Sequence, residues 1–255
     1  MNIVATIQAR MGSSRLPGKV LVNVCNKPML LWQIERIRRS RLINDVVVAT
    51  SKSSLDDEIE KFCIDNKIIC YRGSEDDVLQ RISSLLRDLK VDLHVECHGD
   101  SPLIDPQIID EFIGYWFKHN QFADYFSSAL KTTYPPGSEV TVYHSKVLLT
   151  TNELVAYDDP LREHVGFNIT RFPEKFKLCS LEAPPWLFAP EIYLEVDVED
   201  DLYLVRSIFT HFIELNQEHF SLGEILKMLR NNSKLTKVND AVIRRWKVLR
   251  EKNSI

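Results

Sequence analysis

The sequence has no long apolar run. None of its hydrophobic stretches approaches the roughly 18 residues that a membrane-spanning helix needs. The first residues, MNIVATIQAR, have neither a basic leading region nor an extended apolar core, so they do not predict a secretory signal. These absences argue against an integral membrane protein and favour a cytoplasmic one that makes no membrane contact.

Cysteine is also scarce. Five cysteines occur among 255 residues, an odd number with no C-x-x-C pair, at positions 25, 63, 70, 97 and 179. Such scattered residues predict neither a zinc centre nor a disulfide framework. Reduced thiols in a cytosol fit this pattern better.

The chain lacks both an excess of positive charge and any sign of modular construction. Its formal net charge is −4, which argues against a protein that coats nucleic acid. The sequence contains no internal repeat, linker or low-complexity tract. We therefore expect one domain over residues 1–255, with an insertion-like segment around 122–190 that contacts an acceptor or a second copy of the chain.

Short apolar runs alternate with amphipathic helical patterns along the first part of the chain. Strands are expected at 2–8, 45–50, 68–71 and 93–97, with helical patterns beginning near residues 29, 54, 78 and 105. Later strands are expected at 139–144, 176–182 and 192–196, followed by a helix over 199–215 and two more helices from 222 onward. The alternation predicts an α/β fold with a mostly parallel central sheet flanked by helices.

A basic loop, ARMGSSRLPGKVL at residues 9–21, follows the first expected strand. Loops after parallel strands gather at the carboxyl edge of the sheet, where ligands bind. Glycines permit close backbone approach, while hydroxyls and cations supply donors; these residues are Gly12, Gly18, Ser13, Ser14, Arg10, Arg15 and Lys19. No Asp or Glu precedes Glu35, so nothing nearby in the sequence neutralises the loop. The pattern predicts a cradle for a triphosphate, with a solvated basic loop as the alternative.

Two familiar phosphate-binding motifs do not fit this loop. A Walker A loop needs four residues between its glycines and a Ser or Thr after its Lys, whereas five residues separate Gly12 from Gly18 and Val20 follows Lys19. The dinucleotide fingerprint G-x-G-x-x-G is absent as well. The loop is therefore neither a P-loop of that type nor a dinucleotide site.

Two carboxylates follow expected strands and could share a metal ion. Asp100 comes after the strand at 93–97, and Asp197 comes after the strand expected at 192–196. Mg²⁺ takes one or two carboxylates together with phosphate oxygens and waters, which suits a bound triphosphate. The alternatives are a turn or cap role for Asp100 and a helix N-cap for Asp197.

The basic loop and four later stretches of the sequence resemble the motifs of one enzyme family. QARMGSSRLPGKVL resembles the signature of the spore-coat polysaccharide type of cytidylyltransferase, related more distantly to CMP-Kdo and CMP-sialate synthetases. Four later stretches agree in the same order: RGSEDDVLQR, HGDSPLIDP, REHV and EVDVEDDLYLVR. The resemblance implies a Rossmann-like nucleotidyltransferase fold of the glycosyltransferase A type. It also implies transfer of CMP from CTP to a sugar acid or related acceptor, such as a phosphonate, with release of pyrophosphate for surface polysaccharide or glycoconjugate synthesis.

The resemblance and the residues together give a set of expected roles. Catalytic residues are Arg10, Arg15, Lys19 and Asp100, and Asp100 and Asp197 bind Mg²⁺. The nucleotide contacts Ala9, Arg10, Gly12, Ser13, Ser14, Arg15, Lys19, Arg72, Gly73 and Ser74. The acceptor contacts Glu139, Arg162 and His164, although the last two could equally lie on a solvated helix face. Relatives also make a homodimer an expectation.

Two other functions stay open from the residues alone. Glycosyltransferases of similar fold usually hold their metal with D-x-D, and the nearest match here is Asp197-Val198-Glu199. Its absence favours nucleotidyl transfer modestly over a nucleotide-sugar-dependent glycosyltransferase. A non-catalytic relative that binds nucleotide as a regulator is the second alternative. The acceptor is undetermined, and CTP is expected over another nucleotide only through the resemblance.

Overall fold

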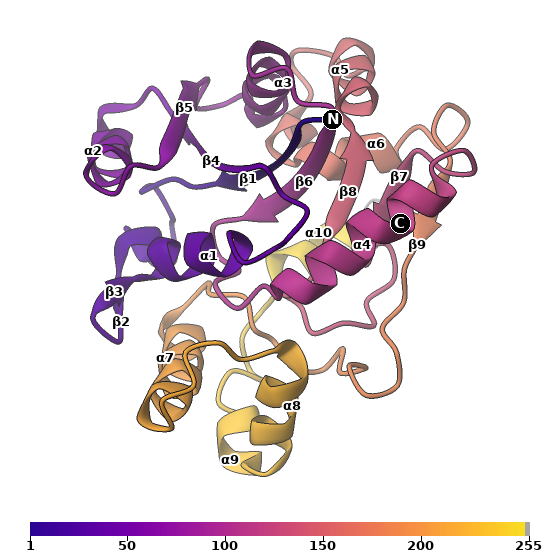
Figure 1. Cartoon of the computed structure of the whole chain (residues 1–255). Helices are drawn as coiled ribbons and strands as arrows, with labels where there is room; N and C mark the ends of the chain where they lie inside the picture. The colour runs from indigo at the N-terminus through magenta and orange to yellow at the C-terminus, as the bar shows by residue number, and fades with distance from the viewer. Residues whose placement is uncertain (253–255) are drawn as a thin grey trace.

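A computed structural model describes residues 1–252, and side chains as far as residue 248. Its centre is a seven-stranded sheet in the order β5-β4-β1-β6-β8-β7-β9 (Figure 1). The strands are β1 (Ile3–Gln8), β4 (Asp45–Ser51), β5 (Ile69–Gly73), β6 (Leu93–His98), β7 (Tyr125–Ser127), β8 (Thr141–His144) and β9 (Leu178–Ser180). The four strands of this sheet that come first along the chain, β1, β4, β5 and β6, pair in parallel, which confirms the expected mostly parallel sheet.

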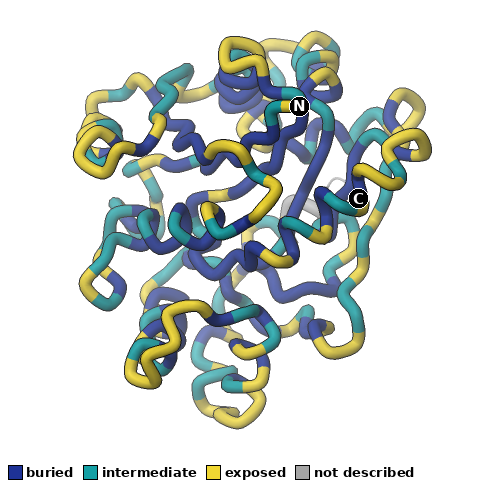
Figure 2. Tube along the Cα trace, in the orientation of Figure 1, coloured by how far each residue is buried: buried dark blue, intermediate teal, exposed yellow. Residues whose placement is uncertain are grey.

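Helices cover both faces of this sheet. Residues alternate along β1, so Ile3, Ala5 and Ile7 pack with α1 (Met29–Ile37) and α4 (Pro106–His119). Val4 points to the other face, which α3 (Val78–Asp88), α5 (Ser145–Leu154) and α6 (Val165–Thr170) cover. Burial on both faces explains why the strands are almost continuously apolar, and the trace through the middle of the molecule is accordingly dark in Figure 2.

Smaller elements connect these layers. They are the hairpin strands β2 (Asn23–Val24) and β3 (Lys27–Pro28), the helix α2 (Asp57–Asp65), and 3-10 turns at Lys19–Leu21, Ser54–Asp56 and Pro160–Glu163. The α2 helix packs beside β5 at one edge of the sheet (Figure 1). The hairpin and β7 are additions to the strands that periodicity predicted.

The segment around 122–190 extends the sheet. It supplies β7, β8 and β9, of which β8 pairs antiparallel with β6 and β9 pairs parallel with β7. Thr141 to His144 and Leu178 to Ser180 lie inside the two ranges in which strands were expected. The acceptor or dimer role of this segment stays a prediction.

The strand expected at 192–196 does not form, and that expectation is wrong. The backbone N–H of Leu194 donates to Pro136 O at 2.7 Å, and that of Val196 donates to Asp100 O at 2.8 Å. These acceptors belong to loops and not to a neighbouring strand. The run is apolar because Ile192, Leu194 and Val196 are buried, and burial alone does not distinguish a strand from a buried extended loop.

The last quarter of the chain is helical. It contains α7 (Glu199–Glu214), α8 (Leu222–Arg230), α9 (Ser233–Thr236) and α10 (Arg245–Lys252), so three helices follow α7 where two were expected. The helices α8 and α9 lie at one end of the molecule, whereas α10 returns to its middle (Figure 1). Within residues 1–252, no helix has the length and apolar character that crossing a membrane demands.

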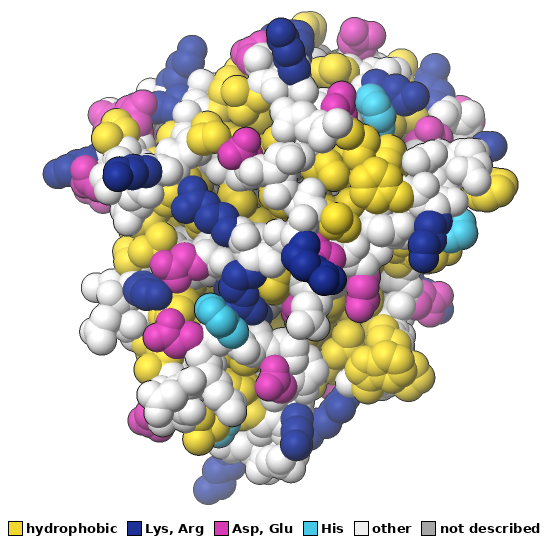
Figure 3. Space-filling view, in the orientation of Figure 1, with side chains coloured by type: hydrophobic (Ala, Val, Ile, Leu, Met, Phe, Trp, Pro, Cys, Tyr) yellow, Lys and Arg dark blue, Asp and Glu magenta, His cyan; other side chains and the backbone are white. Residues whose placement is uncertain are grey.

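The visible surface carries charges of both signs. On the face shown in Figure 3, Lys and Arg side chains are interspersed with Asp and Glu side chains and with small apolar clusters. The net charge of −4 is therefore not gathered into one patch on this face.

Candidate active site

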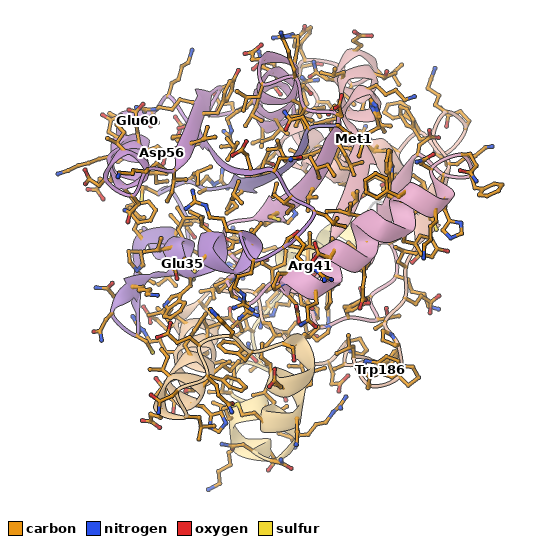
Figure 4. The ribbon with its side chains drawn as sticks, viewed as in Figure 1. Met1, Glu35, Arg41, Asp56, Glu60 and Trp186 are labelled. Carbon is orange, nitrogen blue, oxygen red and sulfur yellow. The ribbon has the colours of Figure 1, made fainter. Side chains whose placement is uncertain are left out.

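The basic loop after β1 is folded tightly and tied to its neighbour. Gly18 has a φ of 69°, and its N–H donates to Met11 O at 2.9 Å, which closes the loop before the turn at Lys19–Leu21. The N–H of Met11 donates to Asp56 Oδ1 at 2.7 Å. Asp56 is buried just before α2, close to Glu60 (Figure 4). An acid from the next strand–helix connection thus fixes the loop.

A cleft of about 250 Å³ lies beside this loop, at the carboxyl ends of β1 and β6. It gathers most of the predicted nucleotide and metal residues, namely Ala9, Arg10, Ser13, Ser14, Arg15, Lys19, Asp100 and Asp197. Gly12 is exposed and does not line it. We call this space the nucleotide cleft, and the roles assigned to its residues stay predictions.

Lys19 joins the loop to both predicted metal ligands. Its Nζ lies 2.6 Å from Val196 O, 3.0 Å from Asp197 Oδ1 and 3.5 Å from Asp100 Oδ2. Arg15 Nη2 lies 2.5 Å from Asp197 Oδ2. The loop that lacks acids in its own sequence is therefore neutralised by acids from two distant segments.

The environment keeps Asp100 ionised. Burial opposes ionisation of Asp100, but the charges of Lys19 and His98 and a hydrogen bond from Ser101 outweigh it and lower its pKa below the usual value. Asp197 is held from behind, because its own N–H and that of Val198 donate to Asp201 Oδ2 at 2.9 and 3.1 Å. Asp197 is therefore oriented even though no strand precedes it.

The donor set fits Mg²⁺. Asp100 Oδ2 and Asp197 Oδ1 both contact Lys19 Nζ, so the two carboxylates converge, and hard oxygens are what this ion prefers. Among the described residues, no three His, Cys, Asp or Glu side chains converge into a protein-only metal centre. Two carboxylates with the remaining positions left to phosphate and water are the usual arrangement for Mg²⁺ beside a nucleotide.

The segment from Arg72 to Ser74 does not line the cleft. Arg72 turns away to Glu60 Oε2 at 2.6 Å and Asp57 Oδ1 at 2.7 Å. Ser74 O accepts from Arg81 Nη1 at 2.6 Å, and a Cβ on Gly73 would lie 2.5 Å from the Arg81 side chain. These residues thus position Arg81, which does line the cleft. Their own contact with nucleotide stays a prediction.

A second chamber of about 270 Å³ adjoins the nucleotide cleft. Four residues line both spaces, namely Gln8, His98, Glu163 and His164, and the second chamber continues past Glu96, Tyr125, Thr141, Gly166, Phe167 and Trp246. We call it the acceptor chamber. Its size and its opening into the cleft suit a small molecule placed next to a bound nucleotide.

A buried carboxylate lies in the wall of this chamber. Glu96 is 5% exposed, and it accepts from Tyr143 OH at 2.7 Å, from Gly166 N at 3.1 Å and from Gln8 Nε2 at 3.3 Å. Burial and the neighbouring carboxylate raise the pKa of Tyr143 well above its usual value, so its hydroxyl stays a donor. The three donors explain how an acid is accommodated in this position.

The residues predicted to face an acceptor lie in different surroundings. His164 lines the acceptor chamber, and burial lowers its pKa, so the imidazole is neutral near pH 7. Arg162 is 2% exposed and donates to Asp77 Oδ2 and Val155 O, both at 2.8 Å. Glu139 accepts from Gly137 N at 2.6 Å. Neither Arg162 nor Glu139 lines the chamber as the structure describes it.

Sequence reasoning missed several residues that line the two spaces. They include Gln8, Arg81, Glu96, His98, Glu163, Arg245 and Trp246. Gln8 and His98 are the last residues of β1 and β6, so a polar residue closing an apolar run was an available signal. The basic run RRWK at 244–247 was a weaker signal, because a charged run is ordinarily a solvated surface.

Two solved structures share this fold. A cytidylyltransferase from Leptospira borgpetersenii matches with a TM-score of 0.87 at 25% identity, over 96% of this chain and 100% of that one. A CMP:2-keto-3-deoxy-manno-octonic acid synthetase complexed with CTP matches with a TM-score of 0.61 at 17% identity, over 83% and 99% of the two chains, which shows the fold. Fold and site together define a nucleotidyltransferase.

The sequence comparisons give the family. The model of the family described as Cytidylyltransferase matches residues 4–237, and the chain belongs to this family. It is 30% identical over 235 residues to the spore coat polysaccharide biosynthesis protein SpsF of Bacillus subtilis, covering 91% of this chain and 95% of the relative. It is 34% identical over 110 residues to a 3-deoxy-manno-octulosonate cytidylyltransferase of Bdellovibrio bacteriovorus, covering 43% and 44%. The expected family, fold and enzyme class are confirmed.

Proposed function

We propose that the chain transfers CMP from CTP to a sugar acid or related small acceptor for surface polysaccharide or glycoconjugate synthesis. The observation that carries the proposal is the convergence of the basic loop, Asp100 and Asp197 on one cleft that opens into a second chamber. The names of two relatives, a spore coat polysaccharide protein and a 3-deoxy-manno-octulosonate cytidylyltransferase, support the product class.

The geometry supports an in-line displacement. CTP lies along the nucleotide cleft with its phosphates against the loop, where Arg10, Ser13 and Ser14 supply donors. A deprotonated acceptor oxygen from the second chamber attacks the α-phosphorus, the bond to the β-phosphate oxygen breaks, and pyrophosphate leaves with the bonding electrons. Positioning and charge stabilisation carry such transfers, so no dedicated nucleophile is required.

Asp100 and Asp197 would hold Mg²⁺, which supplies charge neutralisation at the phosphates when bound. Lys19 holds the two carboxylates close to each other through its Nζ, and Arg15 fixes the second oxygen of Asp197, Oδ2. Gln8, His98, Glu163 and His164 lie at the boundary of the two spaces, where the acceptor oxygen must approach. The residues of the nucleotide cleft therefore orient CTP, and the residues at the boundary with the acceptor chamber orient the acceptor.

Pyrophosphate release tests the proposal. The protein is incubated with each nucleoside triphosphate, Mg²⁺ and a panel of sugar acids and phosphonates. We expect pyrophosphate from CTP with at least one acceptor, and a loss of roughly 100-fold or more in Asp100→Asn. Asp65→Asn, an exposed acid at the end of α2, is the matched control and keeps the wild-type rate.

Two results would contradict the proposal. Absence of pyrophosphate with every triphosphate and acceptor would favour a non-catalytic nucleotide-binding relative. Release of nucleoside diphosphate from a nucleotide sugar, with no pyrophosphate, would favour glycosyl transfer. We also propose that the chain acts in the cytoplasm, where CTP is available. We further propose that it forms a homodimer, and light scattering, which measures the mass of the particle in solution, tests this.

A further inference from the structure

The chain returns to the active site after the part that the family model matches. That match ends at residue 237, and we call residues 243–247 the C-terminal segment. The chain leaves α9 at one end of the molecule, and the segment leads into α10 in its middle (Figure 1). Its position next to the cleft is therefore a property of this chain that lies outside the matched region.

Arg244 anchors the segment in the interior. It is 3% exposed, and its guanidinium donates to Asp201 Oδ1 at 2.7 Å and to Asp201 Oδ2 at 3.1 Å. It also lies 3.5 Å from Glu195 Oε1 and over the ring of Tyr193. A bidentate pair in a buried setting fixes both distance and orientation. Since Asp201 also orients Asp197, one carboxylate sets the position of the segment and of the cleft acid together.

The C-terminal segment and the basic loop each donate one hydrogen bond to the other. Arg15 Nη1 donates to Ile243 O at 3.0 Å, and Arg245 Nη1 donates to Ser14 Oγ at 3.0 Å. Arg245 lines the nucleotide cleft, and the next residue, Trp246, lines the acceptor chamber. Two consecutive side chains thus form part of the wall of the two adjoining spaces.

Arg245 differs in its partner from the three cations of the basic loop. Arg10 pairs with Glu163, whereas Arg15 and Lys19 pair with Asp197. Arg245 instead meets the neutral hydroxyl of Ser14, and this bond uses one of the five N–H donors of a guanidinium. Among the side chains that the structure describes, Arg245 forms no ion pair, so an incoming anion can bind its guanidinium without displacing a carboxylate.

We propose that Arg245 is a further phosphate-binding residue of the nucleotide cleft, and that Arg244 is the positioning residue that holds it there. The inference rests on the proposed function, because it takes the ligand of this cleft to be a nucleoside triphosphate. Arg245 then acts from beside Ser14, so that its guanidinium and the cations of the basic loop contact the same phosphate group.

The test compares binding of CTP with binding of cytidine, by calorimetry in the presence of Mg²⁺ on the full chain. Arg245→Ala weakens CTP binding by about tenfold, the loss expected for charge-assisted hydrogen bonds, and leaves cytidine binding within twofold. Arg245→Lys recovers part of the CTP affinity. Lys247→Ala is the matched control, since Lys247 lies on the same helix but contacts Tyr193, and it changes neither affinity.

The outcomes separate this inference from the proposed function. Wild-type CTP affinity in Arg245→Ala, or an equal loss for CTP and cytidine, would overturn the phosphate role while leaving the enzyme assignment untouched. A wild-type protein that binds no CTP would instead contradict the proposed function. For Arg244→Lys, which keeps the charge but loses the bidentate geometry, we expect a raised KM for CTP with kcat within twofold. A fall in kcat alone would contradict the positioning role.

Discussion

Lys19 Nζ lies 3.0 Å from Asp197 Oδ1, although 178 positions of the chain separate the two residues. The same nitrogen is 3.5 Å from Asp100 Oδ2, so one cation holds two carboxylates that would otherwise repel each other. The Lys19 and Asp197 side chains are only 11% and 17% exposed, so solvent screens their attraction weakly. The core of the site is therefore an ion cluster and not a free phosphate-binding lysine.

Replacing this lysine should make stability depend on Mg²⁺. Lys19→Met removes the ammonium and leaves both acids without their shared partner, so we expect the free energy of unfolding to fall by about 3 kcal/mol in metal-free buffer. Saturating Mg²⁺ should restore part of the loss, because a cation bound between the acids stabilises the folded state. Urea titrations with and without Mg²⁺ measure both effects.

The control for this experiment is Lys27→Met. Lys27 pairs with Glu35 at 3.0 Å on a more exposed part of the chain, so its loss should cost less than about 1 kcal/mol and show no response to Mg²⁺. A Lys19→Met protein whose unfolding midpoint ignores Mg²⁺ would contradict the placement of a metal between Asp100 and Asp197.

Arg10 should matter for the nucleotide and not for the fold. Its ion pair with Glu163 is 2.6 Å long, but the side chains are 54% and 46% exposed, so the pair contributes no more than about 1 kcal/mol to stability. Arg10→Ala should raise the KM for CTP about tenfold with little change in the unfolding midpoint. Arg87→Ala removes a similar exposed pair remote from the cleft and should change neither quantity. Equal KM values for the two variants would exclude a phosphate contact by Arg10.

The basic loop was predictable because its signals are local. Glycines, hydroxyls and cations occur together in residues 9–21, and strand–helix alternation places the loop at the carboxyl edge of a parallel sheet. Asp100 was predictable for the same reason, since it follows β6 closely. Local composition and the order of elements sufficed for the half of the cleft built directly on strand ends.

The partners of buried cations were not predictable. Arg72 and Arg162 begin the motifs RGSEDDVLQR and REHV, but their charges are matched by Asp57 with Glu60 and by Asp77, respectively. Which carboxylate reaches which cation depends on how helices pack on the sheet, and no spacing in the sequence encodes that distance. The strand predicted at 192–196 was wrong for a similar reason, because the apolar residues of this run are buried by loops and do not pair with a neighbouring strand.

Replacing each of two glycines by alanine should change the free energy of unfolding in opposite directions, because the surroundings of the two glycines differ. A Cβ on Gly166 would lie 2.6 Å from Glu96 Oε2 and 3.2 Å from Tyr125 OH, so Gly166→Ala must displace the buried carboxylate and should cost about 1–3 kcal/mol. A Cβ on Gly114, inside α4, meets nothing within 4 Å, so Gly114→Ala should stabilise by up to about 1 kcal/mol through helix propensity. Urea midpoints compare them, and a neutral Gly166→Ala would show that Glu96 is not tightly held.

His94 should make the fold less stable in mild acid. It is fully buried beside Thr6, and burial lowers its pKa to about 4 despite the nearby charge of Glu96. The unfolded chain protonates this residue near pH 6.5, so between pH 6.5 and 4 it binds more protons than the folded chain, and stability rises with pH across that window.

His94 should therefore contribute about 2 kcal/mol to the fall in unfolding free energy from pH 7 to pH 5. In His94→Gln, whose amide can still bond Thr6, we expect the fall to be smaller by that amount. Urea titrations at both pH values measure it, with the exposed His219→Gln as a control that keeps the full pH dependence. If the unfolding free energy of His94→Gln falls from pH 7 to pH 5 by as much as that of the wild type, protonation of this imidazole is not what weakens the fold.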